Sequence, residues 1–439
     1  MKAAPSPQTS VADRTRRRVN RRLMPFLFIL YIVANLDRSN VGFAGLRMSR
    51  ELGFTDEVFG FGGGIFFLGY FLLEIPGTVL VEVWSARKWI ARIMLTWGFM
   101  ASATGWIHSA HQFYGVRFFL GMAEAGFFPG LVVYLSHWYR PEDRGRAVAM
   151  FMAAIPASQI VGAPVAAVLL RVHWLRYDGW RWLLTLEGVP AIALGLVTLF
   201  YLTDRPEQAR WLKPEERDWL VSELARERSA RANHSSWKAM CNPDVLLLAV
   251  ILLLGLAPNY GLSLWLPQMV QRLSVFGVSQ VSLIAAIPYL CALPLMLLTG
   301  WHSDRTGERK WHSALPRLLS GAALTVCFFA TAHVWISVLM LSVATVGFYC
   351  AHPGFWPLPN LFLGRSAAAA SIGLINSFGN LGGFLGPYAV GYLSARTGGF
   401  GWSLLLLAAC AYASGLLVLR VRLGRPKRAQ PTGDEAARL

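Results

Sequence analysis

The chain has little charge and still less acid. Only 15% of its 439 residues are Asp, Glu, Lys or Arg, and 24 acidic residues stand against 41 basic ones. Hydrophobic residues make up 55% of the sequence, whereas a soluble domain has about 25% charged residues. This composition excludes an ordinary soluble domain and predicts a protein embedded in a membrane.

Cysteine is also scarce, and the five cysteines have neither paired nor metal-type spacing. Small packing residues are therefore expected in preference to a disulfide framework or a zinc site. The apolar runs contain no His-x-x-Glu-His, Gly-x-Ser-x-Gly or clustered-histidine pattern. We expect no metal, no cofactor and no enzymatic activity. The cysteines are Cys241, Cys291, Cys327, Cys350 and Cys410.

Apolar runs long enough to cross a bilayer as a helix, about 20 residues, recur along the whole chain. They predict an all-α membrane protein with twelve transmembrane helices in two pseudo-symmetric six-helix bundles. The predicted spans are 23–46, 57–82, 90–109, 112–138, 145–170, 181–202, 244–270, 278–302, 313–331, 334–361, 367–394 and 400–421.

The only long polar stretch lies between the sixth and seventh spans, which divides the chain into two halves. Its apolar residues have a helical spacing, which predicts an amphipathic helix lying along the membrane surface. These residues are Trp211, Leu212, Trp219, Leu220 and Leu224. The predicted organisation is an N-terminal tail over 1–22, a bundle over 23–202, a linker over 203–243, a second bundle over 244–421 and a C-terminal tail over 422–439.

The net charge of +17 comes from basic residues between the apolar runs. It therefore indicates membrane topology, not a nucleic-acid partner. Most lysines and arginines fall in the tails and alternate loops on the side of the N-terminus, which is typical of the cytoplasmic side. Both termini are predicted to be cytoplasmic, in a membrane of the bacterial inner-membrane type. The basic residues expected on the opposite side are Arg47, Arg50, Arg171, Arg176, Arg181, Arg272 and Arg396.

The two halves carry related sequences. Residues 82–89 follow the second span and residues 304–311 follow the eighth, and an acid, two basic residues and a tryptophan coincide in both. A repeat of this size predicts two equivalent bundles that face each other around a central site.

Two adjacent charges, Asp37 and Arg38, interrupt the first span. An ionisable side chain near a bilayer centre costs about 2.5–3.5 kcal/mol, and such residues usually face a water-filled cavity. We therefore expect a solute pathway beside this helix.

The loop after the eighth span resembles the signature loop of the major facilitator superfamily. The matching residues are Gly300-x-x-x-Asp304-Arg305-x-Gly307-x-Arg309-Lys310. In the first-half copy Glu82, Val83 and Ser85 replace the usual acid, arginine and glycine. The resemblance implies a cytoplasmic gate formed by Glu82, Arg87, Asp304, Arg305 and Arg309. The alternative is a set of positive-inside anchors.

Three further segments resemble the anion:cation symporter family, whose members carry tartrate, phthalate, sugar acids and hydroxyphenylacetate-type carboxylates with protons. They are residues 35–44, Arg117-x6-Glu124 and Gly373-x-x-Asn376-Ser377-x-Gly379-Asn380-x-x-Gly383. The resemblance implies substrate contacts at Arg38, Tyr70 and Gln159.

An organic anion needs a cation in a low-dielectric cavity, and arginine supplies two parallel donors that stay charged. Arg38 is the first candidate, and the alternative is an internal ion pair with Asp37 or Glu124. Asn376 and Asn380 lie on one helix face. They could donate to hydroxyls or to a second carboxylate oxygen, or they could form interhelical hydrogen bonds.

Proton coupling needs a carboxyl group that can be neutral or charged. The resemblance assigns proton handling to Asp37 and Glu124, with Arg117 tuning Glu124. The seven-residue gap places Arg117 and Glu124 on one helix face, so the alternative is a static salt bridge between them. Glu74, one turn beyond Tyr70, could line the cavity or pack, and it is not among the predicted site residues.

Together these features predict a monomeric carrier that imports a small organic anion with protons by alternating access. The expected partners are this anion, the proton and membrane lipid. A sodium-coupled or exchange carrier of the same anions is an alternative, as is an exporter of amphipathic compounds, against which the central arginine argues.

Overall fold

The computed structural model describes residues 7–230, 242–330, 333–362 and 365–422, apart from a few side chains within helices. The described residues form helices and no β-sheet. The N-terminal half contains α1 (Pro7–Glu51), α2 (Asp56–Val83), α3 (Ala86–Thr104), α4 (Ala110–Glu124), α5 (Phe127–Ser136), α6 (Pro141–Met152), α7 (Ala154–Leu169) and α8 (Gly179–Tyr201). The linker contains a short 3-10 helix (Pro206–Gln208) and α9 (Pro214–Ala230).

The C-terminal half contains α11 (Pro243–Leu273), α12 (Val278–Ile284), α13 (Ile287–Thr306), α14 (Lys310–Phe329), α15 (Val334–Phe355), α16 (Leu358–Phe362), α17 (Arg365–Thr397) and α18 (Gly401–Arg420). Each predicted span is occupied by one helix or by two consecutive helices. In the described part of the chain, nine helical segments are long and apolar enough to cross a membrane by length and composition. Helices α3, α14 and α17 occupy the third, ninth and eleventh predicted ranges.

Four predicted spans are broken into two helices each. The break between α4 and α5 falls at Gly126, whose φ of 81° is left-handed and favours glycine. A Cβ on Gly126 would lie 2.9 Å from Cα of Gly77 in α2, so this glycine also permits close contact between α2 and α5. Between α15 and α16, Pro357 interrupts the helical hydrogen bonds because it lacks an N–H, although Trp356 before it keeps helical backbone angles.

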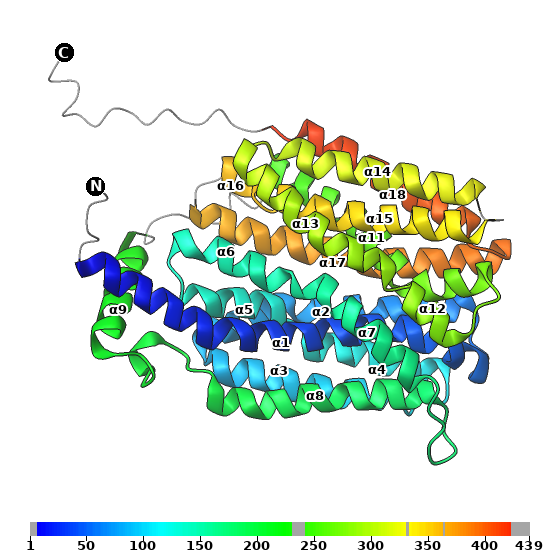
Figure 1. Ribbon diagram of the computed structural model, residues 1–439, viewed down its shortest axis with the longest axis horizontal. Helices are drawn as coiled ribbons and strands as arrows, with labels where there is room; N and C mark the ends of the chain where they lie inside the picture. The colour runs from blue at the N-terminus through cyan, green and yellow to red at the C-terminus, as the bar shows by residue number, and fades with distance from the viewer. Residues whose placement is uncertain (1–6, 231–241, 331–332, 363–364, 423–439) are drawn as a thin grey trace.

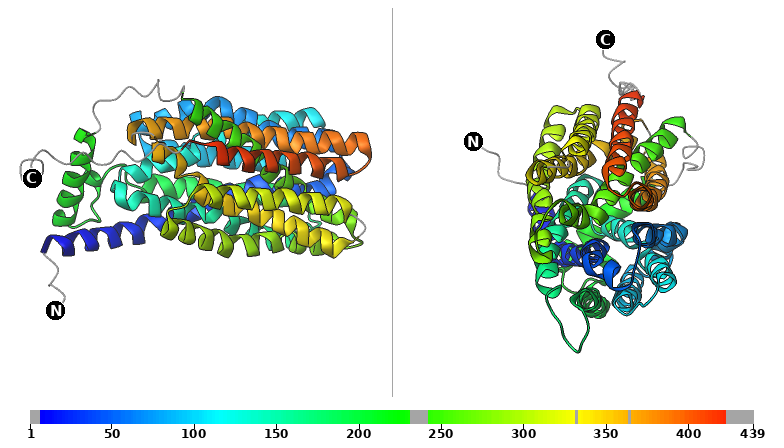
Figure 2. Two further views of the ribbon diagram at one scale, coloured as in Figure 1. Left: turned by 90° about the horizontal axis from the view of Figure 1, so that it is seen from above. Right: turned by 90° about the vertical axis from the view of Figure 1, so that its right-hand side faces the viewer.

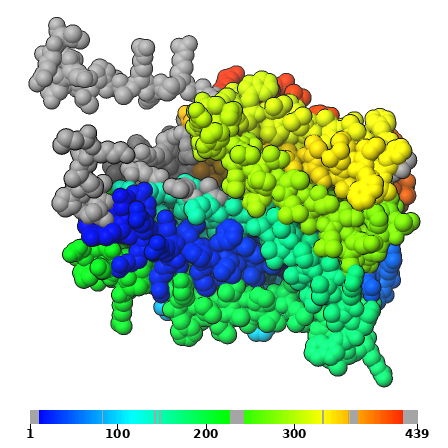
Figure 3. All heavy atoms as spheres, in the orientation of Figure 1, coloured from blue at the N-terminus to red at the C-terminus, as the bar shows by residue number. Residues whose placement is uncertain are grey.

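The helices run roughly along one axis, with the N-terminal half on one side and the C-terminal half on the other (Figure 1). The end-on view in Figure 2 separates the two groups of helices. The start of α1 and α9 lie at one end of the bundle, which we call the α9 end. In Figure 3 the two halves meet along the length of the molecule.

Helix α1 begins within the range predicted as a tail. This stretch contacts α9: Arg18 lies 3.2 Å from Glu216 and Arg14 lies 3.7 Å from Glu215. The predicted linker helix is present as α9, but its apolar side chains Leu220 and Leu224 are buried in the core of the N-terminal half. They pack against protein and not along a membrane surface.

The largest hydrophobic cluster joins the two halves at the end opposite α9. It includes Phe59 of α2 and Trp265 of α11, whose rings make an edge contact with centroids 5.1 Å apart. The other two clusters each draw their buried residues from one side of the molecule.

Polar contacts close the same end. Asp56, at the start of α2, forms an ion pair with Arg272 of α11 and accepts a 2.6 Å hydrogen bond from Ser394 of α17. Nearby, Arg171 donates to Ser279 at 2.5 Å. We call Asp56, Arg272 and Ser394 the polar latch. The halves are therefore held together at the end opposite α9.

Candidate functional site

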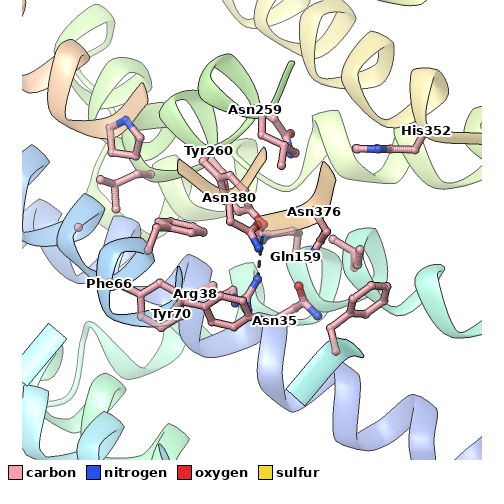
Figure 4. Close-up of a pocket in the computed structure, with 18 of the residues that line it drawn as sticks. Asn35, Arg38, Phe66, Tyr70, Gln159, Asn259, Tyr260, His352, Asn376 and Asn380 are labelled. Atoms are coloured by element: carbon pink, nitrogen blue, oxygen red, sulfur yellow. Dashed lines mark hydrogen bonds between the residues drawn. The ribbon is translucent and has the colours of Figure 1, made fainter. Parts of the chain in front are cut away.

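A cavity of about 110 Å³ lies between the two halves, well above the roughly 10–15 Å³ that one water needs by the same measure. Both halves contribute polar side chains to its wall (Figure 4). The N-terminal half supplies Tyr31, Asn35, Arg38, Tyr70, Arg117 and Gln159, and the C-terminal half supplies Asn259, Tyr260, Ser263, Tyr349, His352, Asn376 and Asn380. Five of these residues, namely Arg38, Tyr70, Gln159, Asn376 and Asn380, are the predicted substrate contacts.

Arg38 lies in the cavity wall on α1. Its Nη2 and Nε contact the same oxygen of Glu124, Oε1, at 2.6 and 2.9 Å. The Arg38 side chain is 16% exposed and that of Glu124 only 1%, so the guanidinium reaches the cavity and the carboxylate lies behind it. The guanidinium also stacks on Phe66 and Tyr70, 5.4 and 5.1 Å from their ring centroids.

Arg117 pairs with the other predicted carboxylate. Its Nη1 lies 3.9 Å from Oδ2 of Asp37, and both side chains are buried. The alternative of a static bridge between Arg117 and Glu124 is therefore not what the structure contains. Residues seven apart on a helix are separated by about 10.5 Å along its axis, and Arg38 of α1 takes the place beside Glu124.

Both ion pairs thus join α1 to α4, and each contains one residue from each helix. Asp37 and Arg38 are adjacent in sequence, but consecutive residues on a helix do not face each other. Asp37 consequently turns toward Arg117, while Arg38 turns toward the cavity and Glu124. Glu124 Oε2 has no hydrogen-bond partner among the described residues, which leaves one carboxyl oxygen open to a proton.

The predicted gate residues lie outside the cavity, and their described contacts stay within their own half. Asp304 pairs with Arg309 at 2.7 Å, and Arg305 stacks on Trp301 at 5.4 Å. In the first half the N–H of Arg87 donates to Asp204 at 2.8 Å. The side chain of Glu82 lies outside the described part of the structure.

Sequence reasoning missed several cavity residues. Tyr31 and Asn35 precede Arg38 at spacings that place all three on one face of α1, and this signal was available. Tyr260, from α11, accepts a hydrogen bond from Arg38 Nη1 at 3.4 Å. The hydroxyl group of Tyr260 within an apolar run was the sequence signal that could have indicated this residue.

Two further carboxyl groups lie at membrane depth. Glu74 of α2 accepts hydrogen bonds from Asn376 and Asn380 of α17. Of the two interpretations of these asparagines, the structure therefore contains interhelical hydrogen bonds, although both residues also line the cavity. Glu187 of α8 has both carboxyl oxygens buried without a hydrogen-bond partner among the described residues.

This architecture, in which two helical halves enclose a polar cavity, defines a multi-pass membrane transporter. The sequence matches the profile of the Major Facilitator Superfamily over residues 27–387 and 279–438. The chain belongs to this superfamily, as the signature loop predicted, and it is a transporter and not an enzyme.

Curated relatives cover nearly the whole chain. A protein named "Putative tartrate transporter" from Agrobacterium vitis is 42% identical over 419 residues, 94% of this chain and 92% of its own. The inner membrane transport protein RhmT of Escherichia coli (strain K12) is 35% identical, over 95% of this chain and 97% of its own. These relatives agree with the predicted resemblance to the anion:cation symporter family.

Solved structures share the fold at low sequence identity. The D-xylose-proton symporter has a TM-score of 0.72 at 15% identity, covering 91% of this chain and 97% of its own. A bacterial homologue of the human lysosomal transporter Spinster, in an inward-facing and occupied conformation, also has a TM-score of 0.72, at 17% identity over 93% and 98% of the two chains. The predicted fold class is thereby confirmed.

Proposed function

We propose that this protein imports a small organic carboxylate together with protons by alternating access. The observation that carries the proposal is the guanidinium of Arg38, held in the wall of a cavity between the two halves. A permanently charged fork of donors at membrane depth matches a carboxylate in both charge and shape.

Binding requires Arg38 to exchange partners. Glu124 occupies one edge of the guanidinium through a single oxygen, and Nη1 extends to Tyr260 in the other half. Protonation of Glu124 removes its charge and weakens its hold on Arg38, which frees the fork for the substrate carboxylate. Proton uptake and anion binding then favour each other, which is the requirement for symport.

The second ion pair supports the same scheme. Arg117 lines the cavity and contacts Asp37, so a proton that reaches Asp37 releases a second guanidinium. Such buried pairs resist separation because an unpaired charge is costly at this depth. Each proton therefore acts at a carboxylate that already restrains an arginine.

The described conformation suits release at the α9 end. The polar latch and the largest apolar cluster close the opposite end, while Asp304 and Arg309 pair within their own half. With the termini on the cytoplasmic side, as the distribution of lysine and arginine indicates, this conformation is inward-facing. Rearrangement of the gate residues across the halves would accompany the outward-facing state.

A carboxylate panel tests the anion class. Purified protein is screened by thermal shift against L-tartrate, D-gluconate, phthalate and 4-hydroxyphenylacetate, and then as Arg38→Ala and Arg38→Lys. We expect at least one anion to raise the melting temperature of the wild type. Arg38→Ala should abolish this rise, and Arg38→Lys should reduce it, because lysine keeps the charge but loses the planar fork. An unchanged shift in Arg38→Ala would refute the assignment.

Uptake into proteoliposomes then separates the coupling modes. An inward proton gradient should drive accumulation of the bound anion without sodium. Accumulation that requires a sodium gradient, or that occurs only in exchange for internal anion, would instead support one of the alternative carriers.

A further inference from the structure

Glu74 belongs to the N-terminal half of the molecule, and its side chain accepts hydrogen bonds from the C-terminal half. It lies on α2 one turn beyond Tyr70, and it is only 3% exposed. Its Oε1 accepts from Nδ2 of Asn376 at 2.5 Å, and its Oε2 accepts from Nδ2 of Asn380 at 3.3 Å. A third contact joins Asn380 Nδ2 to Oε1 at 3.5 Å. These amide donors satisfy a carboxylate that would otherwise be costly at this depth.

The contacts fix which way the two amides point. An ionised carboxylate only accepts hydrogen bonds, whereas an asparagine side chain has a donor end and an acceptor end. With both Nδ2 groups directed at Glu74, Oδ1 is the end of each amide left for other partners. Within the described part of the chain, neither Oδ1 has a hydrogen-bond donor, and both asparagines line the cavity (Figure 4).

A third cavity asparagine has the same arrangement. Asn35 of α1 donates through Nδ2 to the backbone carbonyl of Tyr31 at 2.8 Å. Its Oδ1 is likewise left for another partner. Carbonyl oxygens from both halves are therefore available beside the guanidinium of Arg38.

We propose that Glu74 is a positioning residue that sets the specificity of the cavity. By holding the donor ends of Asn376 and Asn380, it makes the C-terminal wall accept hydrogen bonds. That wall then recognises hydroxyl groups of an anion whose carboxylate is bound by Arg38. This inference rests on the proposed transport of a carboxylate. It adds that the substrate carries hydroxyl groups away from the carboxylate that Arg38 binds.

The charge of Glu74 should also disfavour substrates that carry a second carboxylate. A substrate hydroxyl can donate to an Oδ1 atom, but a second substrate carboxylate only accepts and would meet a wall of acceptors backed by a carboxylate. Hydroxylated monocarboxylates should therefore bind better than dicarboxylates of similar size, and much better than analogues without hydroxyls.

Glu74→Gln tests the orientation directly. A glutamine amide can pair with asparagine in either direction, so it no longer dictates which end faces the cavity. The probes are D-gluconate against hexanoate, and L-tartrate against succinate, with affinity ratios taken from thermal shift titrations. In the wild type the hydroxylated member of each pair should bind tighter. Glu74→Gln should reduce that ratio about fivefold to tenfold, the range of one hydrogen bond.

Glu57→Gln is the matched control, because it makes the same change on the same helix away from the asparagines. It should leave both ratios unaltered. A ratio that stays at its wild-type value in Glu74→Gln would overturn the proposal, since a purely structural role would lower stability without changing selectivity.

A stability cycle tests the contact without any ligand. The melting temperatures of Glu74→Ala, Asn376→Ala and the double variant are compared with the wild type. Coupled residues predict that the double variant loses little more than the worse single variant, whereas fully additive losses would refute the contact. If D-gluconate, hexanoate, L-tartrate and succinate all fail to bind the wild type, the proposed function fails, while this cycle still decides whether Glu74 and Asn376 interact.

Discussion

Arg38 and Tyr260 meet across the cavity, with Nη1 of the arginine 3.4 Å from the tyrosine oxygen. They are 222 positions apart, which is also the offset between residues 82 and 304 of the repeated loop. The two residues therefore occupy equivalent places on α1 and α11. Where the N-terminal half has a guanidinium, the C-terminal half has a neutral phenol.

This substitution makes the cavity electrostatically asymmetric although the fold is nearly symmetric. The cations and their carboxylates are on α1 and α4, whereas α11 and α17 contribute hydroxyl and amide groups. On the proposed function, the N-terminal half would attract the anion and the C-terminal half would orient it.

Glu124→Gln should uncouple transport from the proton gradient. Glutamine resembles the protonated acid and cannot bind or release a proton, so Arg38 stays available for substrate. Gradient-driven uptake into proteoliposomes should be lost, while counterflow exchange of the same anion continues.

Asp37→Asn tests whether the second carboxylate also carries protons. It should weaken the dependence of uptake on the gradient, with exchange retained. Proton-driven accumulation that survives the combined Glu124→Gln and Asp37→Asn variant would disprove the coupling scheme.

Asp56→Asn should loosen the end opposite α9. The change removes the ion pair with Arg272 and weakens the hydrogen bond from Ser394. A partly exposed pair contributes about 1 kcal/mol or less, so the population open at that end should rise up to about fivefold. Electron-spin distance measurements between labels at Arg50 and Arg396, both exposed, would report the change in a background without native cysteines.

Glu57→Gln again serves as the neighbouring control, since its side chain makes no hydrogen bond or ion pair with the C-terminal half among the described residues. It should leave the distance distribution as in the wild type. If Asp56→Asn does the same, the polar latch does not hold this end closed.

Glu187→Leu should stabilise the protein. Both carboxyl oxygens of Glu187 are buried and lack a hydrogen-bond partner among the described residues, and an unsatisfied buried polar group costs about 1–3 kcal/mol. Thermal unfolding in detergent should show a higher melting temperature than the wild type.

Glu124→Leu provides the contrast because it leaves the Arg38 guanidinium without its carboxylate. Removing one partner of a buried pair costs about 3–5 kcal/mol, so the melting temperature should fall. Equal losses in both leucine variants would show that Glu187 is as well partnered as Glu124.

Glu308 should contribute stability that disappears in acid. Partial burial raises the pKa of this carboxyl, but hydrogen bonds from the Trp311 N–H and from the His312 ring and N–H outweigh burial and lower the pKa below 4.5. A lowered folded-state pKa gives stability that is present above the unfolded value and is lost as pH falls through the folded one. The melting-temperature gap between wild type and Glu308→Gln should therefore shrink as the pH falls below about 4.5. A gap that widened below that pH would contradict this sign.

Local patterns in the sequence predicted the spans, their division into halves and several of the residues that line the cavity. Hydropathy along about 20 residues depends only on neighbours in the chain, so Leu23 to Leu46 forms a predicted span whatever surrounds it. A charge such as Arg38 must then find water or a partner at that depth. Its place beside the pathway therefore follows from the local sequence alone.

Only the tertiary structure decided which charge meets which. Arg38 pairs with Glu124 and not with its neighbour Asp37, because Asp37 is beside Arg117, seven residues before Glu124 on the same helix α4. The contact from Glu74 to Asn376 spans 302 positions, and no local pattern encodes such a distance. Which side chains come within contact distance depends on how the helices pack against each other. The tertiary structure therefore determines the identity of the pairs and the polarity of the cavity wall.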